Sequence, residues 1–167
     1  MRKHFFLTNL IAVFCLFLAI AAQPVKAQAP ISYDEFLSMR EDRDLVILNA
    51  AQLEKYFMVV PEEMAKQGKG LSQSQLDLLL ASLIPTKETK VILFCHQNFQ
   101  PTRMLSASES VSYALKENGY TNVRFLENLW GNGSHEEAEK ARMLGEKEII
   151  PFSKKIPENF PLVNKSE

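Results

Sequence analysis

The segment Val91–Asn98 (VILFCHQN) carries the strongest structural signal in this chain of 167 residues. Four apolar residues follow the polar break Thr86–Lys90, and an apolar run of this length predicts a buried strand. Cys95 comes directly after the run, so we expect it at the carboxyl end of that strand. Open α/β sheets bind their ligands at the carboxyl ends of their strands. Cys95 is therefore the first candidate for a functional side chain.

Other strands and helices are predicted on both sides of this segment. Leu45–Leu48 is a second apolar run, which predicts a neighbouring parallel strand, and Val123–Leu126 predicts a third. A serine followed three residues later by Glu or Gln is typical of a helix start, and this pattern occurs at Ser32, Ser72, Ser106 and Ser134. We therefore expect one α/β domain, with a central, mostly parallel sheet of four or five strands and helices on both faces.

The helix after Ser72 has the clearest pattern. Its apolar face consists of leucines at helical spacing, and Pro85 ends it; they are Leu76, Leu79, Leu80 and Leu83. Gly119 is the expected stop of the helix after Ser106, and Gly145 that of the helix after Ser134. Residues 151–167 contain three prolines and show no periodicity, which predicts a loosely packed C-terminal tail.

The first 27 residues have the layout of a secretory signal peptide. A basic start precedes an apolar run of about 13 residues and a small-residue cleavage site after Ala27. That run is shorter than the roughly 20 residues that span a bilayer, so we expect no stable membrane insertion after cleavage. The mature domain is expected at 28–150, followed by the tail, and the protein is expected to be periplasmic or secreted.

The net charge and the cysteine content limit the classes of function that fit this chain. Cleavage removes three of the 19 basic residues and none of the 20 acidic ones, so the mature net charge is about −4 and gives no indication of nucleic-acid binding. Cys15 leaves with the leader, and the remaining Cys95 can form no internal disulfide. In an oxidising compartment, such a thiol is inert, pairs between chains, or is reactive.

The order of motifs around Cys95 resembles the rhodanese-like sulfurtransferase family, in particular its small exported bacterial members. Most of the resemblance lies in residues 91–130, where the strand and cysteine are followed by a loop, a helix, the turn Gly119–Val123 and Trp130. The start at 31–36 and the strand Leu45–Leu48 are similar to the first helix and strand of the family, and the helix of 72–84 to the one before the cysteine strand. The similarity covers roughly residues 31–131.

The resemblance implies that Cys95 is a catalytic nucleophile that carries sulfane sulfur as a persulfide. Inward-pointing loop amides and the start of the next helix would stabilise this anion. The family requires no metal or other cofactor, and its substrates are small sulfur-containing anions and thiol acceptors. His96 could assist ionisation and Arg103 could bind an anionic donor. The substrate- and anion-binding loop is thus predicted to comprise His96, Gln97, Asn98, Phe99, Gln100, Thr102 and Arg103.

Departures from the family pattern weaken the activity that the resemblance implies, and two of them, the changed early turn and the longer cysteine loop, favour an alternative function. Asn49–Ala51 stands where the family usually has an Asp-x-Arg turn, and Glu127–Asn128 where it has two glycines before the Trp. The cysteine loop is also longer than the usual one, because Arg103 lies eight positions after Cys95. The alternative is a catalytically inactive rhodanese-like module that binds a protein partner or a small anion.

Other cysteine-based chemistries do not fit the spacing. A cysteine-dependent phosphatase has five residues between its cysteine and its arginine, and that arginine position is Pro101 here. A thioredoxin-type oxidoreductase needs a second cysteine after two intervening residues, where this chain has Asn98. One cysteine and one adjacent histidine are too few ligands for a metal site.

Overall fold

The computed structural model describes residues 30–95, 107–129, 134–157 and 160, so the predicted signal peptide at 1–27 lies outside them. Within these residues, three parallel strands form a sheet in the order β1-β2-β3; they are β1 (Leu45–Asn49), β2 (Lys90–Phe94) and β3 (Val123–Phe125). A single parallel bridge joins Ile31 to Leu126 on the far side of β3. The expected α/β class with a parallel sheet is confirmed, although the described residues give three strands rather than four or five.

The apolar runs form strands because both sides of the sheet are buried. In register, Val46 lies beside Val91, and Leu48 beside Leu93. The side that carries Leu48, Leu93 and Cys95, here called the first face, belongs to one apolar cluster. The side that carries Ile47, Ile92 and Phe94, the second face, belongs to another. A strand buried on both sides needs apolar residues at every position, which explains the uninterrupted run from Val91 to Phe94.

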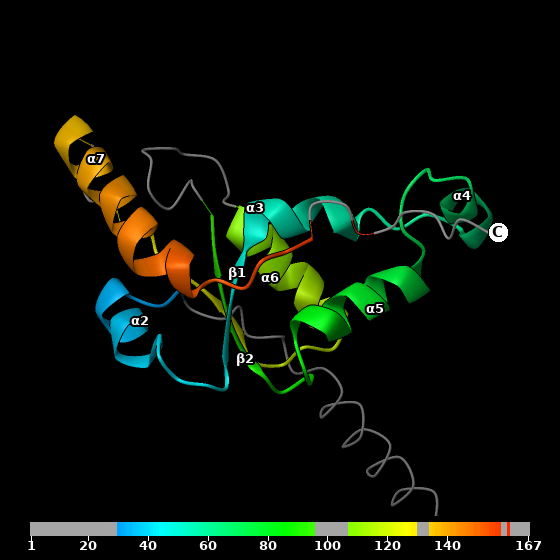
Figure 1. Cartoon of the computed structure of the whole chain (residues 1–167), viewed down its shortest axis with the longest axis horizontal. Helices are drawn as coiled ribbons and strands as arrows, with labels where there is room; N and C mark the ends of the chain where they lie inside the picture. Colours follow the sequence, from blue (N-terminus) through cyan, green and yellow to red (C-terminus); the bar gives the residue numbers. More distant parts are fainter. Residues whose placement is uncertain (1–29, 96–106, 130–133, 158–159, 161–167) are drawn as a thin grey trace, which may run out of the picture.

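Helices that neighbour the strands in sequence cover the first face (Figure 1). They are α3 (Ala50–Leu53), α5 (Gln73–Leu83) and α6 (Ala107–Glu117). The predicted capping box of α5 is complete, because Ser72 and Gln75 each accept the other's backbone N–H through their side chains. All four leucines of its predicted apolar face are buried. Gly119 follows α6 with φ +85°, as expected for a helix stop.

Elements from near the two ends of the described chain cover the second face (Figure 1). They are α2 (Tyr33–Met39), α7 (His135–Leu144) and a π-helical turn, η3 (Gly145–Ile149). Phe36, Ala141 and Ile149 are buried there. Arg40 pairs with Glu148, and its guanidinium lies 4.7 Å from the ring centroid of Phe152. These contacts join the N-terminal helix to the C-terminal segment.

Both helices, α2 and α7, begin and end close to the predicted positions, with two local differences. Ser32 caps α2 by accepting the backbone N–H of Glu35 at 3.1 Å, but the Glu35 carboxylate forms an ion pair with Arg124, a partner distant in sequence. The α-helix α7 ends at Leu144 with Gly145 as its C-cap, as predicted, but Gly145 is buried and the chain continues into the π-helical turn.

The described part of the C-terminal tail is packed, although the sequence predicted a loose segment. After a short 3-10 helix, η4 (Ile150–Phe152), Ile156 is only 6% exposed and belongs to the first-face cluster. The backbone N–H of Lys154 donates to the carbonyl of Ile47 at 2.8 Å. The Tyr56 hydroxyl donates to the carbonyl of Pro157 at 2.5 Å. Residues 150–157 therefore lie across the carboxyl ends of the strands.

The segment between α3 and α5 forms a small extension beside the sheet. It contains a 3-10 helix, η1 (Glu54–Phe57), and α4 (Glu62–Lys66), which follows Pro61. A bridge between Val59 and Leu71 closes this extension. The longest described helices have 11 residues, and none of them is long and apolar enough to cross a membrane.

Candidate functional site

Cys95 lies where the sequence predicts it, one residue beyond the end of the central strand β2. Strand alternation turns its side chain to the first face, the same side as Val91 and Leu93. Its exposed fraction is 0%, and the apolar cluster to which it belongs includes Ala107, the first described residue of α6. The thiol at the predicted strand end is thus fully buried, which the sequence pattern does not determine.

The predicted anion-binding loop cannot be compared with the structure. His96, Gln97, Asn98, Phe99, Gln100, Thr102 and Arg103 all lie outside the described residues. Trp130 also lies outside them. Their assignment as the substrate- and anion-binding loop stays a prediction, and of the predicted site residues only Cys95 is placed.

A pocket that the sequence analysis missed opens at the same end of the sheet. It has a volume of about 880 Å³. It lies where β1 and β2 end, beneath the C-terminal segment, and Cys95 is not among its described lining residues. We call it the strand-end pocket; it is lined by Asn49, Gln52, Phe94, Ile150, Pro151, Ser153, Lys154, Lys155, Ile156 and Pro157.

The polar side chains of the strand-end pocket fall into two groups. Three of them hold the fold. The side-chain oxygen Oδ1 of Asn49 accepts the backbone N–H of Ala51 at 3.1 Å, the Lys154 ammonium donates to the carbonyls of Ser82 and Leu83, and the Ser153 hydroxyl donates to the carbonyl of Ile150 at 2.7 Å. The other two, Lys155 and Gln52, have no such contact within the described residues, where no ion pair engages Lys155 and no hydrogen bond engages the Gln52 side chain. The ten described lining residues include no carboxylate.

Sequence patterns gave no signal for this pocket. Its walls come from three separated parts of the chain, 49–52, Phe94 and 150–157, and none of these parts has a motif that specifies the others. In the described part of the chain, no three His, Cys, Asp or Glu side chains gather in a way that could hold a metal ion.

Comparison of the chain with protein-family models, with curated proteins and with solved structures found no match.

Proposed function

We propose that this chain is a rhodanese-like sulfurtransferase that moves sulfane sulfur through a persulfide on Cys95. One observation supports the proposal most: Cys95 stands at the carboxyl end of the central parallel strand, where α/β sheets bind their ligands. Ala107, the first described residue of α6, belongs to the same apolar cluster as Cys95. The positive end of a helix dipole stabilises a nearby thiolate or persulfide anion.

The chemistry needs two nucleophilic displacements at sulfur. In the first, the Cys95 thiolate attacks the outer sulfur of a donor such as thiosulfate, a new S–S bond forms, and sulfite leaves with the electron pair of the broken bond. In the second, an acceptor such as cyanide or a thiolate attacks the terminal persulfide sulfur. The S–S bond breaks, the product is thiocyanate or a new persulfide, and the Cys95 thiolate is restored. No external oxidant is consumed.

The experiment compares the protein with Cys95→Ser. We expect the unmodified protein to produce thiocyanate from thiosulfate and cyanide, and Cys95→Ser to produce none. Peptide mass spectrometry after thiosulfate treatment should show one added sulfur atom on the peptide that contains Cys95, which also separates it from Cys15. Lys140→Gln, an exposed change on α7, is the control that keeps activity. Absence of both thiocyanate and the persulfide contradicts the proposal.

Burial of Cys95 favours a second candidate, a non-catalytic rhodanese-like module. A cysteine with no exposed surface in an apolar cluster commonly acts as a small apolar side chain and stays inert. Sulfur transfer then requires a movement that uncovers the sulfur atom. Alkylation of the native protein by iodoacetamide measures this: rapid, thiosulfate-sensitive modification of Cys95 supports transfer, whereas modification only after unfolding supports the binding module.

A further inference from the structure

We propose that the strand-end pocket binds a small amphipathic anion, with an apolar body and a single carboxylate or sulfonate group. The site lies at the carboxyl end of the sheet but does not use Cys95. It is therefore independent of the sulfur chemistry proposed above, and the two proposals can fail separately.

The size and walls of the pocket suit a small organic molecule. Its volume of about 880 Å³ falls within the roughly 300–1,000 Å³ of ligand sites in proteins. The apolar lining comprises Phe94 at the end of β2, which is 1% exposed, and the residues Ile150, Pro151, Ile156 and Pro157 of the C-terminal segment. Of these, Ile150 is 46% exposed. An apolar ligand body against such surfaces removes their area from water, which favours binding.

The charged side chains of the pocket favour a negatively charged ligand. Lys154 and Lys155 both line it, and no carboxylate among the described lining residues opposes them. The Lys154 ammonium is held by two carbonyls at the end of α5, at 3.0 Å from Ser82 and 2.8 Å from Leu83. Lys155 has no ion-pair partner in the described part of the chain. Lys155 is therefore the cation that can approach a bound anion.

The side-chain amides of the pocket favour a ligand with one compact anionic group. The Asn49 side chain uses its oxygen to cap α3, so its NH2 group is left to donate towards a ligand. Gln52, one turn further along the chain, adds a second side-chain amide. One ammonium and two amides can satisfy the oxygens of one carboxylate or sulfonate, but they offer too little positive charge for a polyphosphate.

Calorimetric titration with 4-phenylbutyrate, against the neutral 4-phenylbutanol, tests the proposal. We expect saturable binding of the carboxylate with a dissociation constant of about 1 mM, as suits a ligand of this size. Lys155→Gln should weaken this binding about fivefold, because an exposed ion pair contributes up to about 1 kcal/mol. The same change should leave the weaker binding of the alcohol unaltered.

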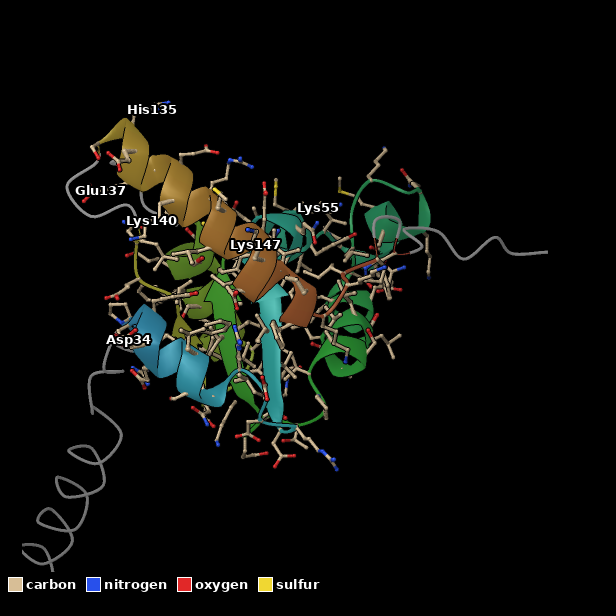
Figure 2. The ribbon with its side chains drawn as sticks, turned by 60° about the vertical axis from the view of Figure 1, so that its left-hand side comes forward. Asp34, Lys55, His135, Glu137, Lys140 and Lys147 are labelled. Atoms are coloured by element: carbon tan, nitrogen blue, oxygen red, sulfur yellow. The ribbon has the colours of Figure 1, made fainter. Side chains whose placement is uncertain are left out.

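Two further variants test whether the loss of binding is specific to the strand-end pocket. Lys140→Gln removes an exposed lysine from α7, outside the pocket lining, and should leave the affinity unchanged (Figure 2). Cys95→Ser should also bind 4-phenylbutyrate normally, even if it loses sulfur transfer. Methyl NMR signals of Ile150 and Ile156 should shift on titration of the unmodified protein. Absence of saturable binding, equal affinities of the Lys155 and Lys140 variants, or methyl shifts confined to other parts of the molecule overturn the proposal.

Discussion

The two faces of the sheet are buried by different means. The first face is covered by α3, α5 and α6, which are the connections between successive strands. The second face is covered by α2, α7 and the π-helical turn, whose residues lie before β1 and after β3. The short connections of crossover helices already place them beside the strands that they join. Helices outside the crossovers need specific long-range contacts, and the second face supplies them through its apolar cluster together with the Arg40–Glu148 and Arg124–Glu35 ion pairs.

Loss of a first-face core side chain should have the largest effect. Leu93→Ala removes a fully buried side chain from the central strand and should lower the free energy of unfolding by about 3–4 kcal/mol. Urea denaturation followed by circular dichroism measures this. Leu78→Ala is the matched control, because Leu78 is 66% exposed on α5 and its truncation should cost less than about 0.5 kcal/mol. A loss below about 1 kcal/mol for Leu93→Ala means that the first face is not a packed core.

The packed C-terminal segment should give the next largest effect. Ile156→Ala truncates a 6% exposed side chain in the first-face cluster and should cost about 2–3 kcal/mol. Ile150→Ala, at 46% exposure, should cost less than about 1 kcal/mol. Thermal unfolding of both variants tests whether this segment is packed. If it were the loose tail that the sequence predicted, neither change would alter the stability of the protein.

The two adjacent lysines of the strand-end pocket should differ in their contribution to the free energy of unfolding. Lys154 connects the C-terminal segment to the end of α5, so Lys154→Gln should lower stability by about 1 kcal/mol. Lys155→Gln should change stability by less than about 0.5 kcal/mol, since no described contact depends on it. Chemical denaturation of the pair measures the difference, and equal losses contradict the division of roles between the two side chains.

The smallest expected effect lies at the amino ends of the strands and belongs to neither face. The backbone N–H of Asp44 and the ammonium of Lys90 both bind the Asp42 carboxylate and lower its pKa. Because the folded pKa lies below the unfolded value of about 3.9, this contribution is present above that pH and is lost as pH falls further. Asp42→Asn should therefore be slightly less stable than the unmodified protein at pH 7, and equal to it at strongly acidic pH. A stability difference between Asp42→Asn and the unmodified protein that grows as the pH falls contradicts this direction of the pKa shift.

Sequence patterns predicted the helices of both faces, including α2 after Ser32 and α7 after Ser134, but not the contacts that complete the second face. The strands and α5 were predicted because their signals are local, either an apolar run or a complete capping box. The second face depends on choices that neighbours in sequence do not determine. Glu35 turns from its own helix cap to Arg124, and the chain continues past the C-cap Gly145 into a π-helical turn whose last residue, Ile149, belongs to the second-face cluster.

The same distinction applies to the candidate sites. The position of Cys95 follows from the strand that precedes it, and it was predicted. Its burial does not follow from the strand pattern, and the strand-end pocket depends on the return of residues 150–157 across β1 and β2. No sequence pattern in those residues points to the strands that they cover. A polar and proline-rich segment was therefore interpreted as a tail, although it forms the wall of a pocket.

The hydrogen bond from the Lys154 backbone to Ile47 has a consequence for self-association. It occupies the outer side of β1, and the bridge between Ile31 and Leu126 occupies the outer side of β3. Unpaired backbone groups on the outermost strands of a sheet are templates for pairing with another molecule and for aggregation. Among the described residues, each side is covered at this point by one residue of passing chain, without an added strand. The segments that contain Ile31 and Lys154 thus limit the pairing of the outer strands with another molecule.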